Sequence, residues 1–120
     1  MNGSIIIDTN SLIYALKNRI DIRSQLLLFP EISAIYVTDC TVLELQGLSN
    51  RVPFASGALK LAEGFPTIHG SGKGDDCILQ AAVTTGSAIL TNDRLLLDRA
   101  RSLGLRTFSI HGGRRIGVSL

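Results

Sequence analysis

Runs of β-branched and aliphatic residues alternate along this chain with segments whose apolar residues recur at helical spacing. The first run, SIIID at residues 4–8, has three consecutive isoleucines, which is typical of a strand buried on both faces of a parallel sheet. Further strands are expected at 34–39, at 87–92, at 106–110 and, as a short one that runs into a glycine-rich loop, from Thr67.

The segments between these strands predict helices. Residues 9–18 place Leu12, Ile13 and Leu16 at helical spacing, and Pro30 ends a second helical segment that begins near Ile20. Other helices are expected at 40–48, at 53–64 closed by Gly64, at 75–86 closed by Gly86, and at 93–104 closed by Gly104.

Strands that alternate with helices predict parallel strands joined by right-handed crossovers. We therefore expect an α/β fold, a three-layer α/β/α sandwich with a central parallel five-stranded sheet. A chain of 120 residues should form one domain, which we place at 1–112, followed by a short C-terminal tail at 113–120.

The composition narrows the class of protein. A hydrophobic share of 45% with only 5% aromatics predicts a core of Ile, Leu, Val and Ala. No apolar run approaches the roughly 20 residues of a membrane span, and residues 1–10 lack the basic start of a signal peptide. We therefore expect a cytoplasmic protein with no membrane partner.

Cys40 and Cys77 form neither a disulfide framework nor a CxxC metal motif, so we interpret both as small buried hydrophobic residues in a reducing compartment.

The charge distribution says more than the net charge of +2, which does not by itself imply nucleic acid. Six arginines fall in the last third of the chain: Arg94, Arg99, Arg101, Arg106, Arg114 and Arg115. They could contact a polyanion, or they could be solvated charges on a helix face and a terminal segment. The glycine-rich loop HGSGKGDD lacks the spacing of the known phosphate-binding glycine motifs.

Acidic residues follow four of the predicted strands, where sites form in open α/β sheets. Asp8 ends the first strand, Glu44 lies one turn into the next helix at a position expected to be half-buried, the pair Asp75–Asp76 opens the helix after the third strand, and Asp93 follows the fourth. Each could singly be a cap or a turn residue. Together they place like charges at one edge, which costs stability unless a cation neutralises them. Carboxylate ligands without His or Cys favour Mg²⁺ or Mn²⁺, ions that support phosphodiester hydrolysis.

The segments that carry these acids have a family resemblance. IIIDTN, TVLEL, GDDCILQAA and ILTNDRLL together resemble the PIN domain family of metal-dependent ribonucleases over almost the whole chain. The family pattern is matched in order by Asp8, by Glu44, by Asp75 with Ile78 three residues on, and by Thr91-Asn92-Asp93. The resemblance implies a parallel five-stranded sheet, the use of Mg²⁺ or Mn²⁺, and cleavage of single-stranded RNA.

Within the family, VTDCTVLELQGL, ALKLAEG and GDDCILQAA resemble the ribosome-assembly branch, which is linked to small-subunit rRNA processing. VapC-type toxins share the four acids and are the alternative, with an antitoxin protein as the expected partner; a homodimer is a further expectation. A non-catalytic PIN scaffold that binds RNA is a third hypothesis. Such a scaffold would be indicated by the absence of acids of the family pattern, and this sequence retains all of them. A receiver-like phosphate acceptor would need a lysine on a late strand, and TFSIHGG has none.

Each candidate side chain can be given a role. Asp8, Asp75 and Asp93 are expected to bind the metal directly or through water. Glu44 is either a ligand or the group that orients and deprotonates the attacking water. Asp76, one residue out of the family spacing, is a candidate ligand of a second ion.

Other residues are expected around these acids. Asn10 and Thr91 are candidates to hydrogen-bond the carboxylates and the scissile phosphate, whereas Thr9 and Asn92 could equally be turn formers. Candidate RNA-binding residues are Lys73, Arg94, Arg114 and Arg115. His69 and His111 have no partner visible in the sequence and are expected to be neither ligands nor bases.

Overall fold

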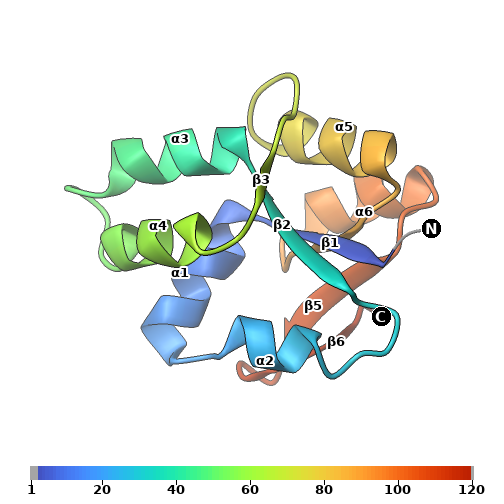
Figure 1. Cartoon of the computed structure of the whole chain (residues 1–120), viewed down its shortest axis with the longest axis horizontal. Coiled ribbons are helices and arrows are strands. Elements are labelled where there is room, and N and C mark those ends of the chain that lie inside the picture. The colour runs from blue at the N-terminus through green and yellow to red at the C-terminus, as the bar shows by residue number, and fades with distance from the viewer. Residues whose placement is uncertain (1–2, 120) are drawn as a thin grey trace.

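The structure, a computed structural model, describes residues 3–119 and shows one six-stranded sheet with helices on both faces (Figure 1). The strands are β1 (Ser4–Ile7), β2 (Ala34–Thr38), β3 (Thr67–Ile68), β4 (Ala88–Leu90), β5 (Thr107–His111) and β6 (Arg115–Val118), in the spatial order β3-β2-β1-β4-β5-β6. The first five are parallel to one another, as predicted, and β6 is antiparallel to β5.

Six helices connect these strands: α1 (Thr9–Asn18), α2 (Ile22–Leu26), α3 (Asp39–Leu48), α4 (Ala55–Glu63), α5 (Asp75–Thr85) and α6 (Arg94–Ser102). The three isoleucines of β1 pack alternately against the two layers of helices. Ile5 and Ile7 are buried in a cluster with residues of α1 to α4, whereas Ile6 is buried in a cluster with residues of α5 and α6. The predicted α/β/α sandwich is therefore confirmed, and it explains why β1 is apolar at successive positions.

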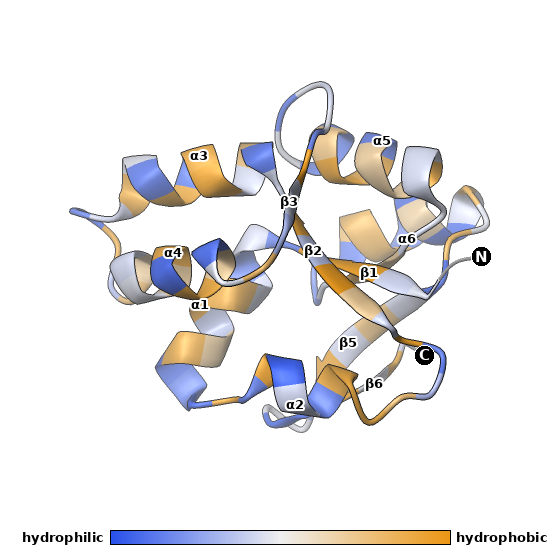
Figure 2. Cartoon of the chain, in the orientation of Figure 1, coloured by the Kyte–Doolittle hydropathy of each residue, from blue (hydrophilic) through white to orange (hydrophobic). Residues whose placement is uncertain are grey.

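The helices have one buried and one exposed face. Figure 2 shows hydrophobic and hydrophilic residues interleaved along α3 and α4. In α4 the buried positions are Ala55, Ala58 and Ala62, which recur every three or four residues. Small side chains at these positions allow α4 to pack closely on the neighbouring helices, in a core where aliphatic residues outnumber the buried phenylalanines Phe65 and Phe108. None of the helices within residues 3–119 is both long and apolar enough to span a bilayer.

The C-terminal segment 113–120, expected to be a tail, contains the four-residue strand β6. A turn at Gly112 and Gly113, with φ angles of 58° and 74°, leads into β6, which pairs with β5 from His111↔Arg115 to Phe108↔Val118. Glycine adopts such positive φ angles without strain. The prediction of a tail was wrong because Ile116 is the only side chain of this short strand that is buried, at 7% exposure, so the apolar signal is weak.

The order of the strands fixes where a site can form. The chain passes from β1 outward through β2 and β3, and then crosses over to β4, β5 and β6 on the other side of β1. The strand order thus reverses between β1 and β4, and in open α/β sheets the crevice at the carboxyl ends of such a pair is the usual position of a site. Asp8 follows β1 and Asp93 lies shortly after β4, so both acids are placed at this crevice.

Candidate active site

A cavity of about 370 Å³ lies at the carboxyl ends of the strands, and we call it the acidic cavity. Its lining includes four of the five acids singled out in the sequence, Asp8, Glu44, Asp75 and Asp93. These residues are supplied by four separate segments of the chain: the end of β1, α3, the start of α5 and the loop after β4. The fold therefore brings together the acids that the sequence places far apart.

Asp8 is the most deeply buried of the acids, with 5% of its surface exposed. It is the N-cap of α1, where its Oδ1 accepts a hydrogen bond from the Ser11 amide at 2.8 Å, and its Oδ2 accepts a hydrogen bond from the Thr91 hydroxyl. Burial raises the pKa of Asp8 above its usual value, an effect that these hydrogen bonds partly offset and that the nearby charge of Asp75 adds to.

Thr91 links Asp8 to Asp93. Its hydroxyl oxygen donates to Asp8 and accepts a hydrogen bond from the Asp93 amide at 3.0 Å. Asp93 in turn caps α6, because its Oδ1 accepts from the amides of Leu95 and Leu96 at 2.9 and 3.2 Å. The fully buried Thr91 thus fixes two of the four acids relative to each other, in the supporting role expected for it.

The adjacent acids Asp75 and Asp76 are placed differently. Asp75 lines the acidic cavity, and its pKa is raised first by burial and then by the charge of Asp93, with smaller contributions from Asp76 and Glu44. Asp76 is exposed, does not line this cavity, and forms an ion pair with Arg99 at 2.6 Å. The structure therefore groups Asp75 with the other acids and directs Asp76 toward α6.

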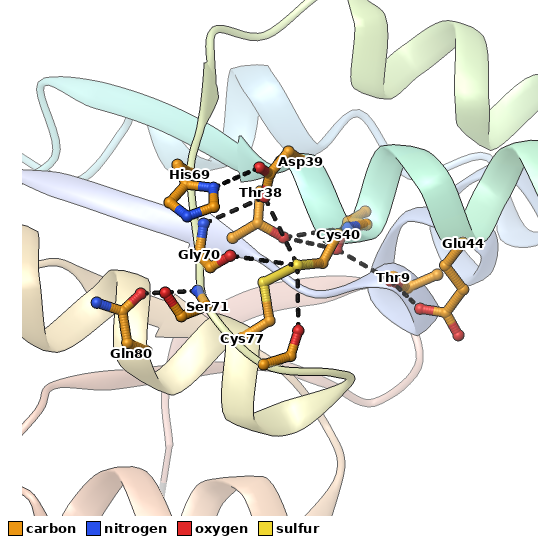
Figure 3. Close-up of a disulfide and its surroundings, with 12 residues drawn as sticks. Thr9, Thr38, Asp39, Cys40, Glu44, His69, Gly70, Ser71, Cys77 and Gln80 are labelled. Atoms are coloured by element: carbon orange, nitrogen blue, oxygen red, sulfur yellow. Dashed lines mark hydrogen bonds and ion pairs between the residues drawn. A yellow bond between two sulfur atoms is a disulfide. The ribbon is translucent and has the colours of Figure 1, made fainter.

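Glu44 is exposed, and the expectation that it would be half-buried was wrong. It lines the acidic cavity from α3, whereas the next residue, Leu45, is buried in the core. The hydroxyl of Thr9 donates to its Oε1 at 2.8 Å, so the carboxylate is held in place from the start of α1 (Figure 3). Thr9, which the sequence left open as a turn former, is itself buried and is a supporting residue that sequence reasoning did not assign.

The other predicted residues are divided between the cavity and its surroundings. Asn10 and Lys73 are exposed and line the acidic cavity. No hydrogen bond from the Asn10 side chain to a carboxylate is found among the described residues. Arg94, Arg114 and Arg115 are exposed outside this cavity. Of the four predicted RNA-binding cations, Lys73 is therefore the one that lines the cavity together with the acids.

Cys40 and Cys77 form a disulfide bond, and their interpretation as free hydrophobic residues was wrong. The bond joins the first turn of α3 to the first turn of α5, directly beside the acidic cavity (Figure 3). Gly70 packs against it, and a Cβ at that position would collide with the Cys77 sulfur. The sequence held one signal for this pairing, since each cysteine lies in the first turn of a predicted helix that follows a predicted strand, and the two strands, β2 and β3, pair in the sheet.

Asp39 organises the loop that precedes Asp75. Its Oδ2 lies 2.7 Å from His69 Nδ1 and its Oδ1 accepts from the Gly70 amide at 3.1 Å, and the bond to His69 is the main reason that the pKa of Asp39 is lowered. His69 thus has a partner that the sequence did not reveal. The ligand atoms of Asp39, Cys40 and Cys77 lie within 4.8 Å of one another, but sulfurs joined in a disulfide supply no thiolate to a metal.

Asn92 was also left open between a turn former and a functional residue. Its Oδ1 accepts from the Ile110 amide at 2.7 Å and its Nδ2 donates to the Ile110 carbonyl at 2.9 Å. This pair of bonds ties the loop that carries Asp93 to β5. Asn92 therefore has a structural role beside the acidic cavity. His111 lies outside the acidic cavity, with its Nε2 3.1 Å from the Val118 carbonyl oxygen.

Comparison with known proteins agrees with this arrangement, although no protein-family profile matches the chain. The chain is 30% identical to ribonuclease VapC9 of Archaeoglobus fulgidus, over 96% of this chain and 88% of that protein. Its fold is similar to that of the PIN domain endonuclease Utp24, with a TM-score of 0.81, 29% identity, and coverage of 97% of this chain and 90% of the other. It is also similar in fold to a chain of the DNA-bound VapBC structure from Salmonella typhimurium, with a TM-score of 0.64, 19% identity, and coverage of 91% and 98%. Together with the four acids at the end of a parallel sheet, these similarities show that the chain belongs to the PIN domain family of nucleases.

Proposed function

We propose that this chain is a metal-dependent endoribonuclease that cleaves single-stranded RNA at the acidic cavity. The observation that carries the proposal is the environment of Asp8. The residue is only 5% exposed, burial raises its pKa, and it lines a cavity together with three other acids. A buried charge is costly and neighbouring like charges add to that cost. A bound cation would offset both costs, which is the physical reason to expect one here.

The donor atoms of the acidic cavity fit Mg²⁺ or Mn²⁺. Asp8, Asp75, Asp93 and Glu44 offer carboxylate oxygens, and the one sulfur in the described lining, that of Cys40, is held in a disulfide. Hard oxygen ligands favour these ions over zinc or copper. When bound at such carboxylates, the ion activates water and stabilises the in-line displacement at a phosphodiester.

The remaining chemistry belongs to the side chains of this protein. Asp93 uses Oδ1 to cap α6, which leaves Oδ2 for a ligand. Glu44, oriented by Thr9, either binds the ion or takes the proton of the attacking water. Lys73 lies on the lining beside the acids and is suited to contact a phosphate oxygen.

Selectivity for RNA must come from the surroundings of the acids, because carboxylates and an ion do not read bases. The exposed cations Arg94, Arg114 and Arg115 would attract the RNA backbone. Single strands are favoured over helices because their bases and backbone can enter a cavity of this size.

The biological role that we propose is rRNA processing, on the resemblance of residues 37–48 and 74–82 to the ribosome-assembly branch. The 30% identity to ribonuclease VapC9 supports the alternative, a toxin ribonuclease with an antitoxin partner. The same acids would cleave RNA in either role. The two roles are therefore distinguished by which RNA is cut.

The activity is tested with an end-labelled hairpin RNA incubated with Mn²⁺, with wild-type protein and with the Asp8→Asn variant. We expect cuts in the loop by the wild type, none in the stem, and none by Asp8→Asn. Asp98→Asn, which changes an exposed acid on α6 outside the cavity, is the matched control and should cut as the wild type does. Equal cutting of stem and loop, or persistent cutting by Asp8→Asn, would contradict the mechanism.

The role is tested with RNA panels. Wild-type protein is incubated with fragments of small-subunit rRNA precursor and with a set of tRNAs, and the cut positions are mapped by primer extension. A discrete cut in the precursor would support rRNA processing, whereas selective cutting of a tRNA loop would support the toxin alternative.

A further inference from the structure

A second cavity, of about 450 Å³, adjoins the acidic cavity and shares Asn10 and Asp93 with it. We call it the side cavity. Its other walls come from α1, from the loop after β4, and from the β5–β6 hairpin, and they include Tyr14, Ile110 and Gly113. A strand of RNA with one phosphate at the acids would therefore have a neighbouring nucleotide at the mouth of the side cavity.

The lining of the side cavity suits an uncharged planar group. It contains no lysine or arginine among its described residues, and Asp93 at the shared border is its one acid. A phosphate would be repelled from such a surface. Tyr14, which is 38% exposed, contributes an aromatic ring, and Ile110 contributes an apolar wall that is 7% exposed.

Tyr14 is held in position by the hairpin. Its hydroxyl donates to the Gly113 carbonyl at 3.4 Å, and a Cβ on Gly113 would lie 3.1 Å from that hydroxyl. The ring is therefore anchored at its polar end while part of its surface is open to the cavity. A ring restrained in this way loses little freedom when a ligand stacks on it.

The polar groups of the side cavity are unequally available. Both polar atoms of the Asn92 side chain are bonded to Ile110, and the Ser11 hydroxyl donates toward the Leu90 carbonyl at 3.5 Å. Asn10 is exposed, and among residues 3–119 no hydrogen bond of its side chain is found. Its amide, which can both donate and accept, is thus free to meet the edge of a ligand.

We propose that the side cavity is a nucleobase subsite, in which the base next to the scissile phosphate stacks on Tyr14 with its edge near Asn10. This inference rests on the proposed function, since that places RNA at the acids. Every base has a face that can stack on an aromatic ring, so Tyr14 provides affinity for any unpaired base. A base in a duplex is already stacked and paired, and the subsite would therefore contribute to selection of single strands.

The subsite is tested by binding, separately from cleavage. A short fluorescent single-stranded RNA is titrated by anisotropy in Ca²⁺, with its integrity checked on a gel. Tyr14→Leu keeps an apolar side chain without the ring, and we expect it to weaken binding by about 5- to 140-fold. Tyr14→Phe should lose much less affinity than Tyr14→Leu, because stacking needs the ring, whereas the hydroxyl contributes only through its long 3.4 Å bond to Gly113. Phe54→Leu, which removes an aromatic residue that is 47% exposed and lines neither cavity, is the matched control.

A second arm uses RNA with a single abasic position moved along the strand. For the wild-type protein, an abasic site at one position of the RNA should weaken binding by the same factor as Tyr14→Leu does with intact RNA. When Tyr14→Leu binds that abasic RNA, the loss of affinity should be no larger than for either change alone. Additive losses, loss with Tyr14→Phe equal to that with Tyr14→Leu, or no binding of RNA by the wild type would overturn the subsite. Cleavage without base-dependent binding would refute the subsite and leave the proposed nuclease intact, whereas base-dependent binding without cleavage would do the reverse.

Discussion

Reduction of the disulfide between Cys40 and Cys77 should cost the protein about 4 kcal/mol of stability. The bond joins residues 37 positions apart and thus closes a loop that contains α3, α4 and β3. In the chain-entropy account, a loop of this length removes about 13 cal/mol/K from the unfolded state, which is about 4 kcal/mol at 25 °C. For a domain of 120 residues, whose unfolding entropy near 60 °C is about 0.25 kcal/mol/K, the melting temperature should fall by about 15 °C.

The measurement is a pair of thermal melts, by circular dichroism, of oxidised and reduced wild-type protein, with the thiols titrated before each melt. The double variant Cys40→Ser with Cys77→Ser is the control for the reductant, because its melting temperature should not respond to it. That variant should also melt somewhat below the reduced wild type, since Cys77 is fully buried and a buried hydroxyl is costly to desolvate.

The reasoning fails if oxidised and reduced wild-type protein melt within about 3 °C of each other, a difference well below the shift expected. It also fails if the native protein, freshly purified without reductant, titrates with two free thiols before and after unfolding. Either result would mean that the two cysteines do not restrain the unfolded chain.

The other predictions concern the acids. Saturating Mn²⁺ or Mg²⁺ should raise the melting temperature of wild type, by the equivalent of about 2.7 kcal/mol at 100 times the dissociation constant, and an unmoved melt would contradict a metal site. Asp8→Asn should be at least as stable as metal-free wild type at pH 8, because asparagine also caps helices and no longer has a charge to bury. Because the pKa of Asp8 is raised in the folded protein, it is the ionised form of Asp8 that destabilises the wild type. The stability advantage of Asp8→Asn over the wild type should therefore shrink as the pH falls through that pKa and Asp8 becomes protonated. A stability advantage that grows on acidification would refute this. Asp75→Asn should abolish cleavage, whereas Asp76→Asn, which breaks only the exposed ion pair with Arg99, should only reduce it, and the reverse ranking would refute this grouping. Replacement of Arg114 and Arg115 together by alanine should weaken RNA binding and flatten its salt dependence, with an unchanged salt slope as the contrary outcome.

The arrangement of strands and helices was predictable because each element carries its own local signal. The isoleucines of β1, the glycines after α4 and α5, and the caps at Asp8 and Asp93 all act within a few residues. The acids could be placed at one edge of the sheet for a related reason, since a parallel sheet aligns the carboxyl ends of its strands. Short-range patterns combined with one topological rule were sufficient for both.

What the sequence did not reveal depends on contacts between distant segments. The bond of Cys40 to Cys77, the pairing of His69 with Asp39 and the support of Glu44 by Thr9 each join residues 30 or more positions apart. The strand β6 was missed for the opposite reason. It pairs locally with β5, but one buried side chain in four residues gives too little hydrophobic pattern to detect.

Two of the four carboxylates at the proposed metal site, those of Asp8 and Asp93, also cap helices, and their hydrogen bonds show why the two roles are compatible. Asp93 caps α6 through Oδ1 alone, and Asp8 accepts one hydrogen bond on each oxygen, so lone pairs remain on both residues. A helix that starts directly after a parallel strand needs a cap, and the cap faces the crevice at the carboxyl ends of the strands. An acid selected as a cap is therefore already positioned as a ligand. The cost arises where these carboxylates are buried close to one another. Burial raises the pKa of Asp8 and of Asp75, and the charges of neighbouring acids add to that rise, so the cation that we propose at this edge would offset a cost that capping does not remove.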